Sequence, residues 1–145
     1  YQPLYTYTVP ANMLGTDRML RLTLNGSFAV YGGTAQTLSL RTTYGGTYLA
    51  SGTVATFSSG QSSGFKVEVL LCAANDTGLQ TAHTRFTRTA TQAPSGLISA
   101  GTADSVTSNI YVAEDATQAL VLGVYAAHSN FFFMTRSHFV VAELV

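Results

Sequence analysis

Apolar and polar residues alternate along much of this chain, with the period of two that is typical of a half-buried β-strand. In the first such segment, Tyr5, Tyr7 and Val9 alternate with threonines until Pro10 ends the pattern. Strands of this kind have one apolar face and pair antiparallel in an all-β protein. The same pattern predicts further strands at residues 20–25, 38–44, 65–72, 81–91, 119–127 and 131–145.

Two of these segments differ in how deeply we expect them to be buried. Segment 65–72 has the clearest core pattern, because large apolar residues occupy every second position from Phe65 to Leu71. Segment 81–91 carries hydroxyl side chains with Arg85 and Arg88 and few large apolar groups, which favours an exposed or edge strand.

The stretch from Val112 to Ala127 is the one place where a helix competes with a strand. Val112, Ala116 and Leu120 approximate a helical stripe. Residues 120–125 are rich in β-formers and contain Gly123, so we predict a strand at 119–127 rather than a helix.

Glycine, serine and asparagine mark the connections between these strands. A Tyr-Gly-Gly-Thr sequence occurs twice, at residues 31–34 and 44–47, and predicts two tight hairpin turns. We also expect a turn at 15–17, a Ser/Gly loop at 58–64, a long surface loop at 92–109 and a connecting turn at 128–130.

Composition supports one all-β domain over residues 1–145 with about eight strands, arranged as a jelly-roll-like antiparallel β-sandwich. Hydrophobic residues make up 46% of the chain and charged residues only 10%, against about a quarter in an average soluble domain. A homotrimer, in which identical neighbours cover part of the surface, would account for the low charge.

Charge and hydropathy exclude several classes of protein. Seven basic residues balance seven acidic ones, and the basic ones are scattered, so we expect no nucleic-acid partner. No apolar run reaches the roughly 18 residues that span a bilayer, so we expect no membrane insertion. Cys72 is the only cysteine and is expected to be a small buried apolar group. Because the first residue is Tyr1, we expect further residues to precede it.

Three patterns suggest chemistry, and each has a simpler structural interpretation. Residues 60–64, Gly-Gln-Ser-Ser-Gly, match the nucleophile elbow of α/β-hydrolases, but a strand follows instead of a helix, so we predict a loop. Glu114 and Asp115 form an adjacent carboxylate pair, which we interpret as a solvated turn. A metal site would need His83, His128 and His138 with Asp76 or Glu143, none of which has ligand-like spacing. We therefore predict no catalytic residue, cofactor or metal.

Other candidate sites lie at the surface or at an interface. Asn25 and Asn75 begin Asn-x-Ser/Thr sequences, which matter only in a eukaryotic secretory setting. Consecutive large residues in a strand point to opposite faces, so one core face cannot hide them all. We predict either a subunit interface or a strand buried on both faces for Phe131, Phe132, Phe133 and Met134, and we include His138 in the candidate interface, because trimers can assemble sites on their axis.

One family resemblance covers most of the chain in order, with weak stretches between Gly78 and Asn109. The chain resembles tailed-phage virion proteins whose domains combine a Pro-Ala-Asn-x-Leu-Gly-Thr turn with a leading Leu-Arg strand. The matching residues are Val9-Pro10-Ala11-Asn12-Met13-Leu14-Gly15-Thr16, Arg18-Met19-Leu20-Arg21-Leu22, Leu38-Ser39-Leu40-Arg41, Tyr44-Gly45-Gly46-Thr47 and Ala142-Glu143-Leu144.

The resemblance implies a trimeric jelly-roll domain on the virion surface, and it carries over no catalytic or receptor-binding residue. Our first functional hypothesis is a non-enzymatic capsid decoration, or cement, protein that binds the major capsid protein. The alternative is the receptor-binding head of a tail fibre or spike, in which exposed tyrosines and Ser/Thr loops, such as the one expected at 50–64, contact host-surface glycan. A glycan hydrolase ranks last, because it needs two carboxylates in a groove.

Overall fold

The computed structural model describes residues 1–31, 35–92, 98–99, 105–129 and 133–145. Within these ranges the chain forms ten strands and no helix, so the all-β prediction is confirmed. No helix in these ranges is long and apolar enough to cross a membrane. The strands are β1 (Gln2–Val9), β2 (Met19–Val30), β3 (Gln36–Tyr44), β4 (Thr47–Phe57), β5 (Ser62–Asp76), β6 (Leu79–Gln92), β7 (Ile98–Ser99), β8 (Ser105–Val112), β9 (Leu120–His128) and β10 (Phe133–Leu144).

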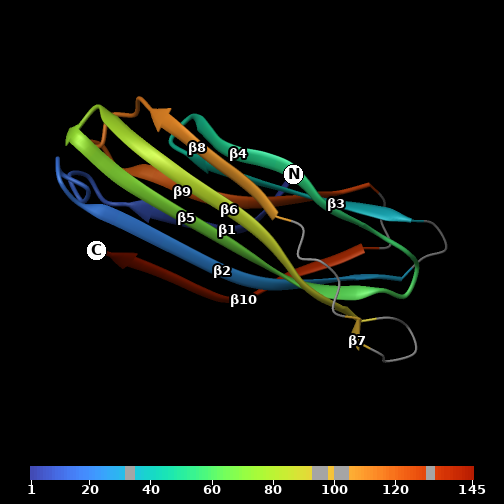
Figure 1. Ribbon diagram of the computed structural model, residues 1–145. Helices are drawn as coiled ribbons and strands as arrows, with labels where there is room; N and C mark the ends of the chain where they lie inside the picture. Colours follow the sequence, from blue (N-terminus) through green and yellow to red (C-terminus); the bar gives the residue numbers. More distant parts are fainter. Residues whose placement is uncertain (32–34, 93–97, 100–104, 130–132) are drawn as a thin grey trace.

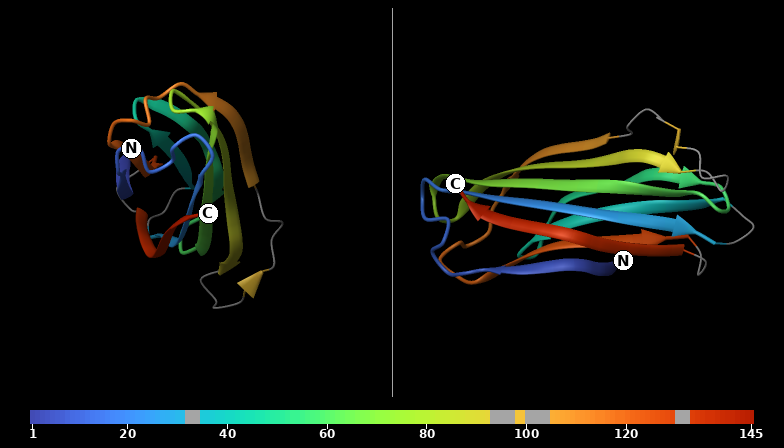
Figure 2. Two further views of the ribbon diagram at one scale, coloured as in Figure 1. Left: turned by 90° about the vertical axis from the view of Figure 1, so that its left-hand side faces the viewer. Right: turned by 90° about the horizontal axis from the view of Figure 1, so that it is seen from below.

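The strands form two antiparallel sheets that run along the length of the molecule (Figure 1). The four-stranded sheet has the order β1-β9-β3-β4, and the six-stranded sheet has the order β10-β2-β5-β6-β7, with β8 also paired to β6. Figure 2 shows the two sheets as two layers. The predicted β-sandwich is confirmed, and its jelly-roll-like character lies in the pairing of β9 and β10 with β1 and β2, from opposite ends of the chain.

The core lies between the sheets and is filled by every second residue of the strands. In β2 the buried side chains are those of Leu20, Leu22, Leu24 and Phe28, and Phe28 stacks on Phe65 of β5. Burying one leucine side chain contributes roughly 2 kcal/mol, so this alternation is the main reason the strands keep their register.

Side-chain contacts join the two sheets along both long sides. On one side the Ser108 hydroxyl of β8 donates to the Leu49 carbonyl of β4 at 2.9 Å. On the other side the Ser137 hydroxyl of β10 donates to the Leu4 carbonyl of β1 at 3.3 Å. These bonds satisfy carbonyl groups at strand edges that would otherwise be open to pairing.

A network of backbone hydrogen bonds holds together the loops at one end of the sandwich, on the left in Figure 1. The Ala116 amide donates to the Thr77 carbonyl, and the Asn12 amide donates to the Ala116 carbonyl, each at 2.8 Å. The hairpin turn predicted at 44–47 is confirmed: Tyr44 pairs with Thr47, and Gly45 has a φ of 57°. In the first Tyr-Gly-Gly-Thr sequence, residues 32–34 lie outside the described residues, so the turn predicted there is not tested.

The prediction of an edge strand at 81–91 is wrong, because β6 lies between β5 and β8. Its inward residues include Thr84 and Gln80, which are fully buried although polar. Because polar residues occupy some inward positions, the pattern of hydrophobic residues does not identify this strand as a central one.

Two predicted loops were too long. Residues 62–64 of the expected Ser/Gly loop belong to β5, where they pair with β2. Residues 105–109 of the expected loop at 92–109 belong to β8, which pairs with β6. A paired strand that is rich in serine and threonine has the same composition as a loop. Composition alone therefore did not distinguish these strands from loops.

The last strands are close to their predicted positions. Strand β9 confirms the strand predicted at 119–127, and no helix forms there. His128, expected in the following turn, ends β9 instead, and Asn130 lies outside the described residues. The strand predicted at 131–145 is β10, in which the register shifts between Ser137 and Phe139, so that His138 is the extra residue of a β-bulge.

Candidate functional site

The outer face of the four-stranded sheet carries a group of tyrosines around Arg41. Arg41 of β3 pairs with Tyr125 of β9 and Ser51 of β4, and all three side chains lie on the face away from the core. Tyr48 lies on the same face although it is only three residues from Ser51. A β-bulge in β4 allows this, because it turns both Leu49 and Ala50 inward.

The Arg41 guanidinium contacts aromatic rings and no acceptor. Its central carbon lies 3.7 Å from the centroid of the Tyr1 ring and 4.6 Å from that of the Tyr48 ring. Its Nε is buried and has no hydrogen-bond partner among the described residues. A buried donor without an acceptor costs about 1–3 kcal/mol, and the two cation–π contacts, at about 0.5–2 kcal/mol each, are of similar size.

These side chains border a shallow hollow of about 340 Å³. We call it the arginine hollow and define it by Tyr1, Arg41, Thr43, Tyr48 and Tyr125 together with the Gly45-Gly46 turn. Its volume lies at the lower end of the range of small-molecule sites, about 300–1,000 Å³.

Two contacts hold the tyrosines of the arginine hollow in place. The Tyr125 ring covers Gly123: a Cβ atom at that glycine would lie 2.5 Å from Tyr125 Cε2. The hydroxyl groups of Tyr1 and Ser51 are hydrogen bonded at 3.3 Å. The side chains are therefore positioned by the sheet before any ligand binds.

Glu114, from the loop between β8 and β9, supports the turn at the edge of the arginine hollow. Its Oε1 accepts hydrogen bonds from the Gly46 amide at 2.8 Å and from the Thr47 hydroxyl at 2.7 Å. Below the turn, burial and, to a lesser extent, the Glu114 charge raise the pKa of Tyr44 to about 12. Tyr44 therefore stays neutral at physiological pH.

The adjacent carboxylates Glu114 and Asp115 bind different parts of the chain. Asp115 Oδ1 accepts from the Thr117 hydroxyl and amide, and these bonds hold the pKa of Asp115 below its usual range. Because Glu114 binds the β3–β4 turn and Asp115 binds its own loop, the two carboxylates have separate structural roles. This agrees with the interpretation of the sequence as a turn.

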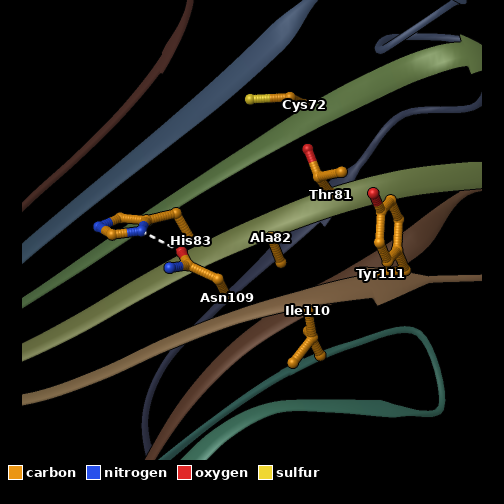
Figure 3. A pocket seen from close by; sticks show the side chains of 7 residues that line it. All are labelled: Cys72, Thr81, Ala82, His83, Asn109, Ile110 and Tyr111. Carbon is orange, nitrogen blue, oxygen red and sulfur yellow. Dashed lines mark hydrogen bonds between the residues drawn. The ribbon is translucent and has the colours of Figure 1, made fainter.

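The outer face of the six-stranded sheet carries a second hollow, of about 250 Å³, shown in Figure 3. We call it the cysteine hollow, with outward side chains from Cys72, Thr81, His83, Asn109 and Tyr111. Cys72 is partly exposed, so the prediction of a buried thiol is wrong. In β5 it lies one residue past Leu71, which faces the core, and so it faces outward.

Cysteine, histidine and asparagine together suggest a thiol nucleophile, but their geometry does not form one. His83 Nδ1 is hydrogen bonded to Asn109 Oδ1. No hydrogen bond joins the Cys72 thiol to His83 among the described residues. The backbone amides beside them belong to paired strands, so they are not free to form an oxyanion hole.

Two pairs of oppositely charged side chains lie elsewhere on this face. Lys66 and Glu68 form an ion pair at 2.7 Å, and Arg21 and Glu143 form one at 3.9 Å. All four side chains are well exposed, so each pair contributes well under about 1 kcal/mol.

The described side chains that we considered for a metal site, and rejected on their spacing, do not lie together. His83 lies on the six-stranded sheet and His128 at the end of the four-stranded sheet. Asp76 accepts from the Gly78 amide, and Glu143 pairs with Arg21. No cluster of three possible ligands occurs in the part of the chain that is described. The His138 side chain lies outside that part.

Neither the hydrolase-like motif nor the Asn-x-Ser/Thr sequences form a site. Ser62, the central serine of the motif, is the first residue of β5 and not part of a strand-to-helix turn. Asn25 lies within β2, which is paired on both sides. Asn75 is an exposed residue near the end of β5, where the register with β6 shifts between Ala73 and Asp76, and it has a φ of 61°.

The predicted interface residues are only partly covered by the structure. Phe131 and Phe132 lie outside the described residues. Phe133 and Met134 begin β10, where their backbones pair with Val30 and Ala29. The interface remains a prediction.

Sequence analysis did not select the residues of the arginine hollow. The available signal was the placement of Arg41 and Tyr125 at polar positions of alternating strands. No protein-family model, curated protein or solved structure matches this chain.

Proposed function

We propose that this protein is a non-enzymatic structural protein of a tailed-phage virion, a trimeric capsid decoration protein that binds the major capsid protein at the particle surface. The family resemblance supports this role by analogy. A cement role needs buried area and several binding points, and it needs no catalytic group.

The observation that carries this proposal is an apolar surface at the end of the chain. Phe139 of β10 is 57% exposed on the outer face of the six-stranded sheet, two residues before Val141 on the same face. Leu144 and Val145 are also exposed at the end of this strand. Leu144 pairs with the buried residue Leu20 and faces the inner side of the sheet, so we call only Phe139, Val141 and Val145 the C-terminal strip. Grouped exposed apolar side chains are typical of a surface that a second subunit covers.

The first test measures the mass of the purified protein in solution and its co-sedimentation with capsid shells that lack it. We expect a trimer that binds shells and raises their resistance to heat. A monomer would contradict the proposal. A trimer that ignores shells and binds host cells would favour the receptor-binding alternative.

A pair of variants tests the C-terminal strip itself. Phe139→Ser is expected to weaken the trimer or its binding to shells, because it removes the largest apolar side chain of the strip. Tyr111→Ser is the matched control, since Tyr111 is an aromatic residue 77% exposed on β8, outside the strip. Equal loss in both variants would contradict a specific role of the strip.

The receptor-binding alternative, the head of a tail fibre or spike, is supported by the arginine hollow. Exposed tyrosines and hydroxyl groups around a preformed hollow suit a glycan. This alternative predicts that binding of the protein to host cells is inhibited by soluble glycan.

A further inference from the structure

We propose that the arginine hollow binds a sugar that carries a carboxylate, a hexuronic acid residue of a glycan, with Arg41 as the group that recognises the acid. This inference rests on the receptor-binding alternative above and names its ligand class.

The first step is that Arg41 has no hydrogen-bond acceptor among the described residues. Among the described residues it makes ring contacts and no hydrogen bond or ion pair. Its Nε is shielded from water, unlike the charged groups of Arg21 and Lys66, which are exposed and paired with carboxylates. The terminal Nη groups of Arg41 also have no hydrogen-bond partner among the described residues and, unlike Nε, are not buried, so they are the donors that a ligand can reach.

The second step is that a carboxylate fits Arg41 better than other groups do. A guanidinium has donors in a rigid planar fork that matches the two oxygens of a carboxylate. The rings of Tyr1 and Tyr48 contact the cation without accepting its N–H groups in conventional bonds, so they restrict its orientation and leave donors available. Arg41 is also available to a carboxylate of a ligand because, in the described ranges, no acidic residue of the chain lies within ion-pair distance of it.

The third step is that the surroundings of Arg41 fit a sugar ring. The Tyr48 side chain is 62% exposed and that of Tyr1 48% exposed, so both rings are accessible from outside. The negative face of an aromatic ring attracts the polarised C–H groups on the face of a sugar. Hydroxyl groups of Thr43 and Ser51 lie on the same face of the sheet and can exchange hydrogen bonds with sugar hydroxyls.

The test compares two sugars that differ only in the acid group. Methyl glucuronide and methyl glucoside are titrated into the full chain, and binding is followed by saturation-transfer NMR. We expect the glucuronide to bind roughly tenfold more tightly than the glucoside, and the difference to shrink at high salt.

Variants assign this preference to Arg41. Arg41→Met should abolish the preference for the acid, and Arg41→Lys, which keeps the charge but not the fork, should reduce it several-fold. Arg85→Met is the matched control, because Arg85 is an exposed arginine on the outer face of the other sheet. Thermal unfolding of each variant shows that it is folded.

The outcomes separate this inference from the receptor-binding alternative. Equal binding of both sugars, or an equal effect of Arg41→Met and Arg85→Met, overturns the acidic-sugar assignment and leaves glycan binding standing. Binding of neither sugar overturns both. A glutamate-containing peptide that binds Arg41 as tightly as the glucuronide also overturns the assignment, in favour of a protein partner.

Discussion

The two outer faces of the sandwich differ in how their cationic side chains are partnered. On the six-stranded sheet, Arg21 and Lys66 are exposed and form ion pairs with carboxylates. On the four-stranded sheet, Arg41 contacts the rings of Tyr1 and Tyr48, and its buried Nε has no acceptor in the described part of the chain. A folded protein gains nothing in stability from an unsatisfied buried donor, and such groups are concentrated at binding sites. The difference lies in the partners of these cations: Arg21 and Lys66 are paired with carboxylates of their own face, whereas Arg41 has no acceptor among the described residues.

The largest expected effect concerns the turn that borders the arginine hollow. Gly45→Ala should lower the free energy of unfolding by about 3 kcal/mol, because alanine is strained at a φ of 57° and its Cβ would lie 2.5 Å from Glu114 Oε2. Gly46→Ala is the control, since its Cβ would lie 3.6 Å from Glu114 Oε1, an ordinary contact. Urea unfolding measures both, and equal losses would mean that Glu114 does not support this turn.

The next effect is a dependence of stability on alkaline pH, caused by Tyr44, which is buried beneath the same face. The folded pKa of Tyr44 is raised from 10.0 to about 12, so the neutral phenol stabilises the fold below pH 10, and this stabilisation is lost as the pH rises toward 12. The free energy of unfolding of the wild type should therefore fall by about 2 kcal/mol as the pH rises from 10 to 12. Tyr44→Phe should not show this fall, because it has no phenol to ionise. Unfolding curves recorded across this pH range test it. If wild type and variant decline in parallel, the Tyr44 phenol is not the responsible group.

A smaller change in stability is expected for Arg41 itself, and it tests whether this side chain serves binding or the fold. Arg41→Met should change the free energy of unfolding by less than about 1 kcal/mol, because the lost cation–π contacts and the removed unsatisfied donor nearly cancel. Thermal unfolding is the measurement. A loss of several kcal/mol would instead make Arg41 a structural residue and would remove the contrast between the faces.

The smallest effect is expected on the six-stranded face. Glu68→Gln breaks the ion pair with Lys66 and should cost about 0.3 kcal/mol at low salt, and less at high salt, where exposed charges are screened. Unfolding at two ionic strengths checks this. A cost that persists at high salt would show that the pair is more than a solvated surface contact.

Much of the fold was predictable from local pattern. The alternation of Leu20, Leu22 and Leu24 marked β2, and the Gly45-Gly46 pair marked the β3–β4 hairpin. Strands with small or polar inward residues were harder, and β6 was assigned to an edge because Thr84 and Gln80 do not look like core residues. Their burial depends on β8 pairing along the other side of β6, which alternation does not encode.

The candidate site was less predictable than the fold. Strict alternation puts Tyr48 and Ser51 on opposite faces, and only the β-bulge in β4 brings both outward beside Arg41. Tyr125 lies beside Arg41 on β9, and Tyr1 contacts it from the start of the chain. Both are far from Arg41 in sequence. A pattern within one strand has no information about these neighbours.

The sequence by itself determined the all-β class, the hairpin at Gly45 and Gly46, and the inward faces of β2 and β5, because period-two alternation and positive φ are local properties. The tertiary structure decided which strands are central, which carboxylate supports which turn, and which tyrosines surround Arg41. Those outcomes depend on register and on pairing between distant segments, which follow from packing the whole chain at once.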